Sequence, residues 1–572
     1  MASTDGYYSL FADVNKLHKN EDNEEGVISL RTPELDLKVE DEELLKLKKQ
    51  WETRWSVYVG RIEEAQKENE KYWKGKHFTE VEMEKRPLID NRIFSSLETF
   101  LPIITKQNPE PQVTGDNSEQ GEALADKVRK MLSYQADIQK LKLKLKKMTR
   151  MWALYMLGCV KVGWDRIEDD IKTVVVRTQK LVLDPDATID EDGYTGEYIG
   201  EYRRDKASLL VVRFPSKKAI IEKEVDKKMG TEVQYMEWWT NDYMFWTLKN
   251  EVLGKARNPH WNYDKDIEST DQYGQIMSQS VTGKNHFTVP QKPYVFLSVF
   301  NVGLHPYDDT SMIQQNLALQ DLINKRMRQI DRNVDGMNGG VVISGDVFSA
   351  EQASQITDAL RKGAAILVPG GDVNTAYKRE TGTPLPGDVF NNLLDARNEV
   401  DNIFGTHAAT RGERQGPETA TGKLLLKGGD ESRAGMITDY IEQVADKVFN
   451  WWVQLMYVYY DEAHVASILG EEKTKEYITL QKDEFQGKLL ISVREGSLVP
   501  KDPLIKREEA LQLWSAGAIG PIELYEKLDF PNPRKSAEQL FMWQTNPASL
   551  FPNLAPPMPV DPGMPPPVGN IV

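Results

Sequence analysis

The sequence contains a single cysteine, Cys159, among its 572 residues, so no disulfide can form within one chain. A lone thiol is typical of a protein kept in a reducing compartment, and such a residue more often packs in a core than reacts. The chain also lacks any run of the ~18 apolar residues that a membrane span needs, and its first residues do not show the basic and apolar pattern of a signal peptide. We therefore expect a protein that is made and kept in soluble form, without a membrane partner.

Signatures of catalysis and of metal binding are missing as well. The seven histidines are scattered, with no pair at metal-ligand spacing, and no G-x-S-x-G motif is present. The loop RGERQGPETATGK looks like a phosphate-binding loop, but the spacing between Gly416 and Gly422 is wrong, and Pro417 removes an amide donor. Leu424 stands where a Ser or Thr hydroxyl would bind magnesium. We predict no enzyme activity, no cofactor and no metal.

The composition is that of a globular protein with an excess of acidic residues. Hydrophobic residues make up 40% of the chain and charged residues 28%, and at ~100–200 residues per domain the length allows three or four domains. The formal net charge is −16. Tight binding to nucleic acid depends on Lys and Arg neutralising phosphates, so this charge favours loose contact with DNA at most.

Helices are predicted in the first part of the chain. Residues 1–40 have no apolar period and predict a flexible arm, after which a helix begins near Asp41. A second helix is predicted by an apolar face formed by Ile93, Phe94, Leu97, Phe100 and Leu101, and a long third one covers Gln120–Leu157. The lysines of KLKLKLKK in this third helix form either a solvated face or a patch for nucleic acid or membrane.

Strands are predicted from Gly158 to about residue 300. The segments VKVGWDR, IKTVVVRTQKLVL, VQYMEWWTNDYMFWTL and PYVFLSVFNVG alternate or carry many aromatic residues. A polar loop is expected around Asn258–Asn285. The carboxylates of DPDATIDEDG do not fit the spacing of a calcium loop, which favours a turn between strands, with a calcium site as the alternative.

The second half of the chain has a distinctive order of elements. A helix at Thr310–Asp335 leads into a small insert with strand VVIS, helix SAEQASQITDALRKG and strand AAILV. A second helix, the Gly/Pro/Thr loop and a very long helix at Thr421–Ala463 follow. The segment ITLQKDEFQGKLLISVREG then predicts a hairpin, REEALQLWSAGAIGPIELYEKL a helical pair, and the last residues a proline-rich tail without regular structure.

This order resembles the portal proteins of tailed bacteriophages and herpesviruses over about residues 40–545. Local segments agree: PLIDNRIFSSLETFLPIITKQNPEPQV resembles an early portal helix, and YMLGCVKVGWD resembles the step into the portal wing. The segment ETATGKLLLKGGDESRAG resembles the family's loop-to-helix segment. The resemblance implies an α+β portal fold with an α/β wing, a helical stem, a small α/β clip insert, a long tunnel-loop helix and a short helical crown.

The resemblance also implies the boundaries of the parts. The flexible arm covers 1–40, the wing 41–309, the first stem helix 310–335, the clip 336–385, the second stem helix 386–406 and the tunnel loop 407–420. The long helix and the return to the wing cover 421–500, the crown 501–545 and the disordered proline-rich tail 546–572.

Candidate site residues follow from these parts. In the tunnel loop, Arg411, Arg414, Gln415 and Thr419 are expected to face DNA. In the first stem helix, Lys325, Arg326 and Arg328 either face the channel or pair with nearby aspartates. In the clip helix, Glu351, Gln352, Arg361 and Lys362 are candidate contacts with protein partners.

The long helix is apolar over most of its circumference, with Ile437, Ile441, Val444, Val448 and Trp452 on one stripe. Such a helix is buried either in the core of its own chain or partly by neighbouring subunits.

The resemblance implies a homo-oligomeric ring, usually of twelve subunits, at one capsid vertex of the virion. The ring is assembled in the host cytoplasm and conducts double-stranded DNA during packaging and ejection. Implied partners are the terminase, head–tail adaptor proteins, the major capsid protein and a scaffold where one exists. The alternatives are another ring-forming head–tail connector and a nucleotide-dependent packaging motor subunit, which the failed phosphate-loop spacing disfavours.

Overall fold

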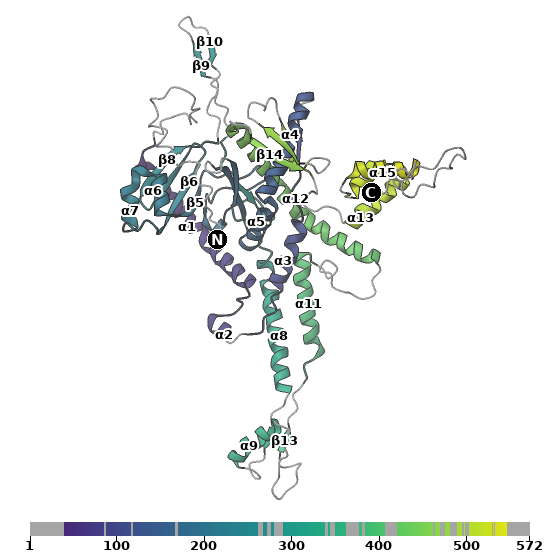
Figure 1. Ribbon diagram of the computed structural model, residues 1–572. Helices are drawn as coiled ribbons and strands as arrows, with labels where there is room; N and C mark the ends of the chain where they lie inside the picture. Colours follow the sequence, from purple (N-terminus) through teal and green to yellow (C-terminus); the bar gives the residue numbers. More distant parts are fainter. Residues whose placement is uncertain are drawn as a thin grey trace, which may run out of the picture. The chain divides into compact units, whose positions relative to one another are not determined.

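The computed structural model describes residues 39–84, 87–115, 118–165, 170–260, 267–270, 276–279, 290–337, 341–343, 349–361, 377–379, 384–406, 420–460, 464–469, 475–480, 489–494, 497, 503–528, 530 and 532–545. They fall into two compact units (Figure 1). The first draws on Met1–Asp461 and Gln481–Val499, and the second on Glu462–Leu480 and Pro500–Val572. The mixture of helices and antiparallel sheets confirms the predicted α+β class. The proposed limits of wing, stem, clip and crown stay predictions.

Two antiparallel sheets of the first unit hold most of the predicted strands. One has the order β4–β5–β6–β7–β8 and the other β11–β2–β3. Their strands are β2 (Gly158–Asp165), β3 (Asp170–Val175), β4 (Leu181–Leu183), β5 (Ile199–Lys206), β6 (Glu232–Trp239), β7 (Tyr243–Leu248), β8 (Glu251–Arg257) and β11 (Tyr294–Leu297). Short helices α6 (Ala207–Arg213) and α7 (Lys218–Glu224) join β5 to β6. The expected polar loop is partly wrong, because β9 (Ile267–Thr270) and β10 (Ile276–Gln279) pair within it.

Aromatic side chains form the core of the five-stranded sheet. Trp238 on β6 is fully buried, and its ring lies 5.4 Å from that of Trp51 on helix α1 (Asp41–Trp73). The Trp51 ring also stacks on Tyr198 at a centroid distance of 4.4 Å. Cys159 is fully buried among the same apolar residues, so its side chain packs as expected. Because large aromatic rings bury much apolar area, this cluster fixes α1 against the sheet.

Helix α1 continues beyond the sheet and binds the end of helix α5 (Leu141–Tyr155) by polar contacts. Gln66 donates to the carbonyl of Tyr155 and Asn69 to that of Leu154, both at 3.0 Å. Helix α2 (Glu80–Glu84) follows, and then α3 (Arg92–Ile104), whose buried residues match the predicted apolar face with one exception. Phe94 is 45% exposed, so its assignment to the buried face was wrong.

The long helix predicted for Gln120–Leu157 is broken in two. Helix α4 (Glu119–Ile138) ends before Lys140, whose φ of 53° is left-handed, and α5 (Leu141–Tyr155) begins directly after it. At the break the Gln139 side chain accepts from the amide of Thr173 and donates to the carbonyl of Ile171, each at 2.8 Å. The break thus satisfies backbone groups of β3 that a continuous helix would leave open.

The lysine-rich segment lies on α5 with two of its leucines buried, while the third, Leu143, is 58% exposed. Leu141, Leu145 and Met148 are fully buried, whereas Lys147 is exposed and Lys142 and Lys146 are half-buried. This arrangement agrees with the solvated-face interpretation of KLKLKLKK.

The carboxylates of DPDATIDEDG organise a turn, as predicted. The Asp190 carboxylate accepts from the backbone amides of Asp192 and Gly193, at 3.1 and 3.0 Å. Ile189 and Tyr194 form a β-bridge across the turn. Among the described residues, no group of three or more His, Cys, Asp or Glu is arranged to hold a metal ion.

The long helix α12 (Ala420–Tyr459) is buried by its own chain over the part whose side chains are described, from Ala434 onward. Ile441, Val448 and Trp452 are fully buried, and the Trp452 indole donates to Thr173 on β3 at 2.8 Å. The helix packs against α3, α4 and the three-stranded sheet. The apolar stripe is therefore explained by the core of one chain and gives no support of its own for neighbouring subunits.

The predicted hairpin in ITLQKDEFQGKLLISVREG is wrong. Its first strand belongs to β15 (Lys475–Leu480), which pairs with β14 (His464–Leu469) in the second unit. Its second strand, β16 (Leu490–Val493), pairs with β1 (Pro111–Thr114) in the first unit. The second unit continues with α13 (Pro503–Ser515) and α14 (Pro521–Lys527), which confirm the predicted helical pair, and with α15 (Pro533–Thr545).

Two antiparallel helices, α8 (Leu317–Met337) and α11 (Gly387–Phe404), flank the insert. The first helix starts later than predicted, because Ser311 turns inward to bond the carbonyl of Ala153 at 2.6 Å and a 3-10 turn (Gln314–Asn316) precedes α8. In the insert, β12 (Val341–Ile343) pairs with β13 (Tyr377–Arg379), a strand that was not predicted, and α9 (Ala350–Arg361) matches the predicted helix. The predicted strand AAILV lies outside the described residues.

We expect Gly200→Ala to lower the free energy of unfolding by about 1–3 kcal/mol, because a Cβ at this position would lie 2.6 Å from the ring of Trp238. Thermal unfolding followed by tryptophan fluorescence measures the change. Gly60→Ala on α1 is the matched control, since nothing lies within 4 Å of its Cβ, and there the better helix propensity of alanine should raise stability by up to ~1 kcal/mol. Equal midpoints for the two variants would contradict this account of the core.

Candidate functional site

The helix pair α8 and α11 occupies the positions predicted for the stem helices. The two helices lie side by side (Figure 1) and bury Ile323 from α8 and Leu393, Ala396 and Val400 from α11. Further along, the Arg326 side chain donates to the Asn392 side chain at 2.7 Å. Apolar side chains thus hold the pair together laterally, and Arg397 on α11 adds a polar contact by donating to the sulfur of Met327 on α8 at 3.6 Å.

Two ion pairs join α11 to the start of α3 and the residues just before it. Arg397 binds the Asp90 carboxylate through two nitrogens, at 2.8 and 2.7 Å. Arg92 binds the Asp401 carboxylate at 2.6 Å, and Ser96 donates to the other oxygen of Asp401 at 2.9 Å. Asp401 is only 4% exposed. The buried carboxylate is therefore neutralised by a cation and bonded through both of its oxygens, as burial of a charge requires.

The same short segment holds α8 through Gln320. The Gln320 amide donates to the carbonyl of Asp90 at 2.7 Å and accepts from the backbone amides of Arg92 and Ile93, at 3.0 and 3.3 Å. Gln320 is fully buried. We call Asp90, Asn91 and Arg92 the stem root, because this segment binds both helices of the pair.

Asn91 fixes the stem root itself. Its side chain caps α3 by accepting from the amide of Phe94 at 3.0 Å. Its amide nitrogen donates to the carbonyls of Tyr72 and Trp73 at the end of α1, at 3.1 and 3.2 Å. The stem root is thus connected to α1 and α3 as well as to the helix pair.

A second polar contact joins α8 to the end of α1. His77 bonds the side chain of Asn324 at 2.9 Å and the carbonyl of Tyr72 at 2.8 Å, and the Tyr72 hydroxyl donates to Asp321 at 2.8 Å. Burial lowers the pKa of His77, although both hydrogen bonds oppose this shift. The first turns of α8 are therefore bonded on two sides.

The predicted basic residues of the first stem helix have different surroundings. Lys325 is exposed. Arg326 bonds Asn392 and also Gln329, at 2.8 Å, and Arg328 bonds the carbonyl of Asn324 at 3.3 Å. The Arg328 guanidinium also lies 4.5 Å from the centre of the Phe78 ring. The partners of these two arginines are neutral groups, and the proposed DNA contacts stay predictions.

The other predicted contact residues lie in the insert and the loop. Glu351 and Gln352 are exposed on α9, and Arg361 ends that helix. The side-chain oxygen of Gln352 accepts from the backbone amide of Ser349 at 3.0 Å. The backbone amide of Gln352 donates to the Ser349 hydroxyl at 3.4 Å, and the two bonds form a capping box. Lys362, Arg411, Arg414, Gln415 and Thr419 lie outside the described residues.

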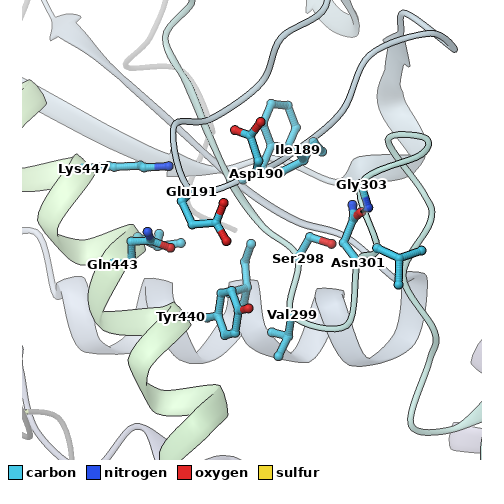
Figure 2. A pocket seen from close by; sticks show the side chains of 14 residues that line it. Ile189, Asp190, Glu191, Ser298, Val299, Asn301, Gly303, Tyr440, Gln443 and Lys447 are labelled. Atoms are coloured by element: carbon cyan, nitrogen blue, oxygen red, sulfur yellow. Dashed lines mark hydrogen bonds between the residues drawn. The ribbon is translucent and has the colours of Figure 1, made fainter.

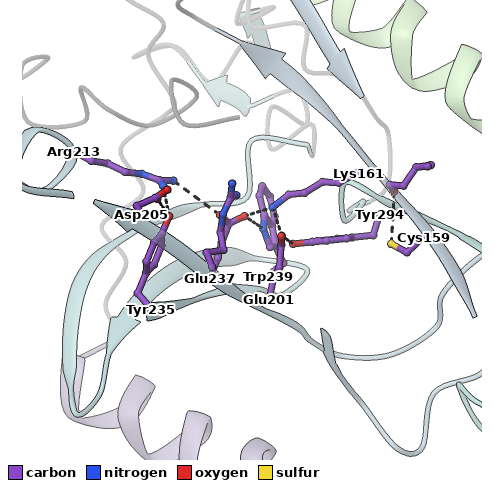
Figure 3. Close-up of polar contacts among 11 residues, drawn as sticks. Cys159, Lys161, Glu201, Asp205, Arg213, Tyr235, Glu237, Trp239 and Tyr294 are labelled. Atoms are coloured by element: carbon purple, nitrogen blue, oxygen red, sulfur yellow. Dashed lines mark hydrogen bonds and ion pairs between the residues drawn. The ribbon is translucent and has the colours of Figure 1, made fainter. Parts of the chain in front are cut away.

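A cluster of buried charges connects the two larger sheets (Figure 3). Lys161 on β2 binds Glu201 on β5 at 2.8 Å and Glu237 on β6 at 2.5 Å. Arg203 binds the other oxygen of Glu237 at 2.9 Å. The hydroxyl of Tyr294 donates to Glu201 at 2.8 Å. Lys161 is 1% exposed, so the sheets are joined by a charge that water does not reach.

The cations determine the protonation state of this cluster. Burial acts to raise the pKa of Glu237, but Lys161 and Arg203 outweigh it and hold the pKa well below its usual range. The pKa of Glu201 is lowered by the same balance. The pKa of Tyr294 is raised, first by burial and then by the neighbouring carboxylates. Both carboxylates stay ionised and Tyr294 stays neutral at physiological pH.

A small cavity of about 220 Å³ lies between α12 and the loops near residues 190 and 300 (Figure 2). Tyr440, Gln443 and Lys447 line it from α12, and Asp190 and Glu191 line it from the opposite loop. Burial lowers the pKa of Lys447, while the surrounding carboxylates act to raise it. Among the described residues that line this cavity, no nucleophile is paired with a base. No group of three or more His, Cys, Asp or Glu among them could hold a metal ion.

Sequence reasoning missed the stem root and the charge cluster. Asn91 followed by an apolar helical pattern is a visible capping signal. A lysine inside an apolar strand, as Lys161 is in CVKVGW, also signals a buried partner. The partners themselves lie up to 309 residues away along the chain.

No helix in the described part of the chain is long and apolar enough to span a membrane.

The order of body, helix, insert, helix and long helix is the order expected of a portal protein. The sequence matches the family described as phage P22-like portal protein over residues 48–497. The chain belongs to this family. Among solved structures, the chain is similar to one described as "Neck of empty GTA particle computed with C6 symmetry", with 12% identity and a TM-score of 0.35 over 77% of this chain and 91% of that chain. No curated protein matches.

We expect Lys161→Met to lower the free energy of unfolding by about 3–5 kcal/mol at neutral pH, because Glu201 and Glu237 would stay buried without their shared cation. In the native protein the lowered pKa of these carboxylates adds stability that is present above the unfolded pKa and is lost as pH falls through the folded pKa. In the variant, Arg203 still opposes burial at both carboxylates, but the contribution of Lys161 is lost. The pKa values should therefore rise relative to those in the native protein, and part of the stability difference should recover on acidification.

Urea unfolding at about pH 7.5 and about pH 4.5 compares the two proteins across the relevant window. Lys67→Met is the control, because the Lys67–Glu63 pair is exposed and its loss should cost less than ~1 kcal/mol. A stability difference for Lys161→Met that is the same at both pH values would contradict the electrostatic account of this cluster.

Proposed function

We propose that this protein forms a homo-oligomeric ring, with twelve subunits, at a single vertex of a phage capsid. The ring conducts double-stranded DNA during packaging and ejection. It provides the platform on which the terminase and later the head–tail adaptors dock, and it contacts the major capsid protein and a scaffold where one exists. The protein acts without hydrolysing nucleotide. The observation that carries the proposal is the family match, which spans the sheets, the helix pair, the insert and the described part of α12.

The surface of the helix pair supports assembly into a ring. Phe390 and Leu394, one turn apart on α11, are 45% and 54% exposed, and Val334 on α8 is 60% exposed. Apolar side chains at helical spacing on an exposed face are typical of a surface that another protein covers. Neighbouring copies of the same helix pair would bury these side chains in a ring.

The insert and the loop supply the proposed contacts with partners. Glu351, Gln352, Arg361 and Lys362 belong to the surface offered to the terminase and adaptors. The loop that carries Arg411 and Arg414 follows α11 directly, so in a ring its copies would surround the axis. These two arginines, in a chain with a net charge of −16, would touch phosphates without holding them, which suits a moving duplex.

Negative-stain images of the purified protein test the ring. We expect rings with a central hole, and we expect Phe390→Asp combined with Leu394→Asp to shift the protein to smaller species, since each buried Phe or Leu contributes about 1.5–3 kcal/mol. Mass photometry measures the distribution. Asn391→Asp is the matched control, because this residue is also exposed on α11. A wild-type protein that stays monomeric would overturn the proposal.

Deletion of Thr410–Gln415 tests the DNA channel. We expect the variant to form normal rings but to package or retain less DNA, because Arg411 and Arg414 would no longer reach the duplex. Nuclease-protected DNA in particles assembled with the variant measures the effect, and images of the rings serve as the control. Unassembled subunits would show that the loop is needed for the ring instead, and normal DNA content would remove it from the channel.

A further inference from the structure

We infer that the stem root, Asp90–Asn91–Arg92, is the positioning site that sets the axial register of α11 and the position of α8 for DNA passage. The inference rests on the proposed function, because it assigns these residues a role in the channel. It is carried by the contacts of three consecutive residues with four helices: α1, α3, α8 and α11.

The order of charges determines the register of α11. Asp90 and Arg92 have opposite charge, and they bind Arg397 and Asp401, which also have opposite charge and are one helical turn apart. Four residues of an α-helix rise ~6 Å. If α11 moved along its axis by one turn, either Asp401 would face Asp90 or Arg397 would face Arg92. Both displaced positions bring like charges together, so the pairs favour one register.

Burial strengthens this preference. The side chains of Arg92 and Asp401 are 19% and 5% exposed, and those of Arg397 and Asp90 are 29% and 26% exposed. A displaced α11 would leave the Asp401 carboxylate buried without Arg92, and an unpaired buried charge is strongly unfavourable. Apolar contacts along the helix pair discriminate registers less sharply, because apolar burial is non-directional.

Gln320 fixes the position of α8 against the same segment. Its amide group bonds the carbonyl of Asp90 and the amides of Arg92 and Ile93, so α8 is placed against the backbone of the segment whose side chains hold α11. The two helices are therefore positioned by one short piece of chain. A force applied to the insert, which connects their other ends, would act on the stem root through both helices.

The test compares Arg397→Ala with Arg150→Ala. The Arg150–Glu98 pair is a matched control, since it is also a two-nitrogen contact, at 2.8 and 2.6 Å, with side chains 30% and 25% exposed, but it joins α5 to α3 and touches neither α8 nor α11. Hydrogen exchange of the full-length protein is measured by mass spectrometry over Leu317–Met337 and Gly387–Phe404. Nuclease-protected DNA is measured in particles assembled with each variant.

We expect about tenfold faster exchange in these two helices for Arg397→Ala than for Arg150→Ala, because a charge-assisted contact is lost. Packaged DNA should fall for the first variant and not for the second. Asp90→Arg should behave like Arg397→Ala. Combining it with Arg397→Asp rebuilds the pair with its charges exchanged and should restore slow exchange. Packaging should stay low, because residues 397 and 401 then carry the same charge and a one-turn shift no longer brings like charges together.

Equal exchange in the two alanine variants, or no recovery of slow exchange in the exchanged pair, would overturn the inference. Faster exchange with normal packaging would also overturn it, because the register would then have no part in DNA passage. The exchange measurement needs no DNA. A wild-type protein that fails to package while Arg397→Ala still loosens both helices selectively would therefore contradict the proposed function and leave the positioning of the helices standing.

Discussion

The central constraint in this structure is that two helices, α8 and α11, have to be held at one end while the chain between their other ends forms a separate insert. The stem root holds both helices by ionic and hydrogen-bonded contacts, and the geometry of these contacts allows few positions of the helices. Apolar burial between the helices supplies lateral cohesion, but it is non-directional. The position of the pair relative to α1 and α3 therefore depends on a few polar groups, and their burial makes each of them costly to break.

The sheets behind the stem root are joined on the same principle. Lys161 reaches from β2 to carboxylates on β5 and β6, and it links two sheets that share no strand pairing. A purely apolar contact would allow several packings of similar energy, whereas a buried cation between two carboxylates is satisfied in one. The surrounding aromatic core supplies stability, and the charges specify which strands face each other. The body to which the helix pair is attached is therefore itself specified by polar contacts.

The sequence predicted the elements better than their partners. Periodicity located the start of α1, and the extent of α11 and α12, to within a few residues, because it reports local burial. The hairpin near residue 480 was mispredicted because two strands close in sequence pair with β14 and β1 instead, and local patterns do not encode that choice. The break at Lys140 was missed because a lysine in a left-handed conformation leaves no sign in a helical pattern. The stem root was missed because its ion pairs connect residues about three hundred positions apart.

The family assignment and the side-chain contacts explain different features of this molecule. Membership of the P22-like portal family accounts for the order of the elements. It does not identify which side chains determine the geometry. Asp401 has the surroundings expected of such a residue, because it is buried, charged and bonded through both oxygens to α3. A helix that had only to pack would place an apolar residue there, since burial of an ion pair adds little net stability. The charge is better explained by the need for one defined register than by stability.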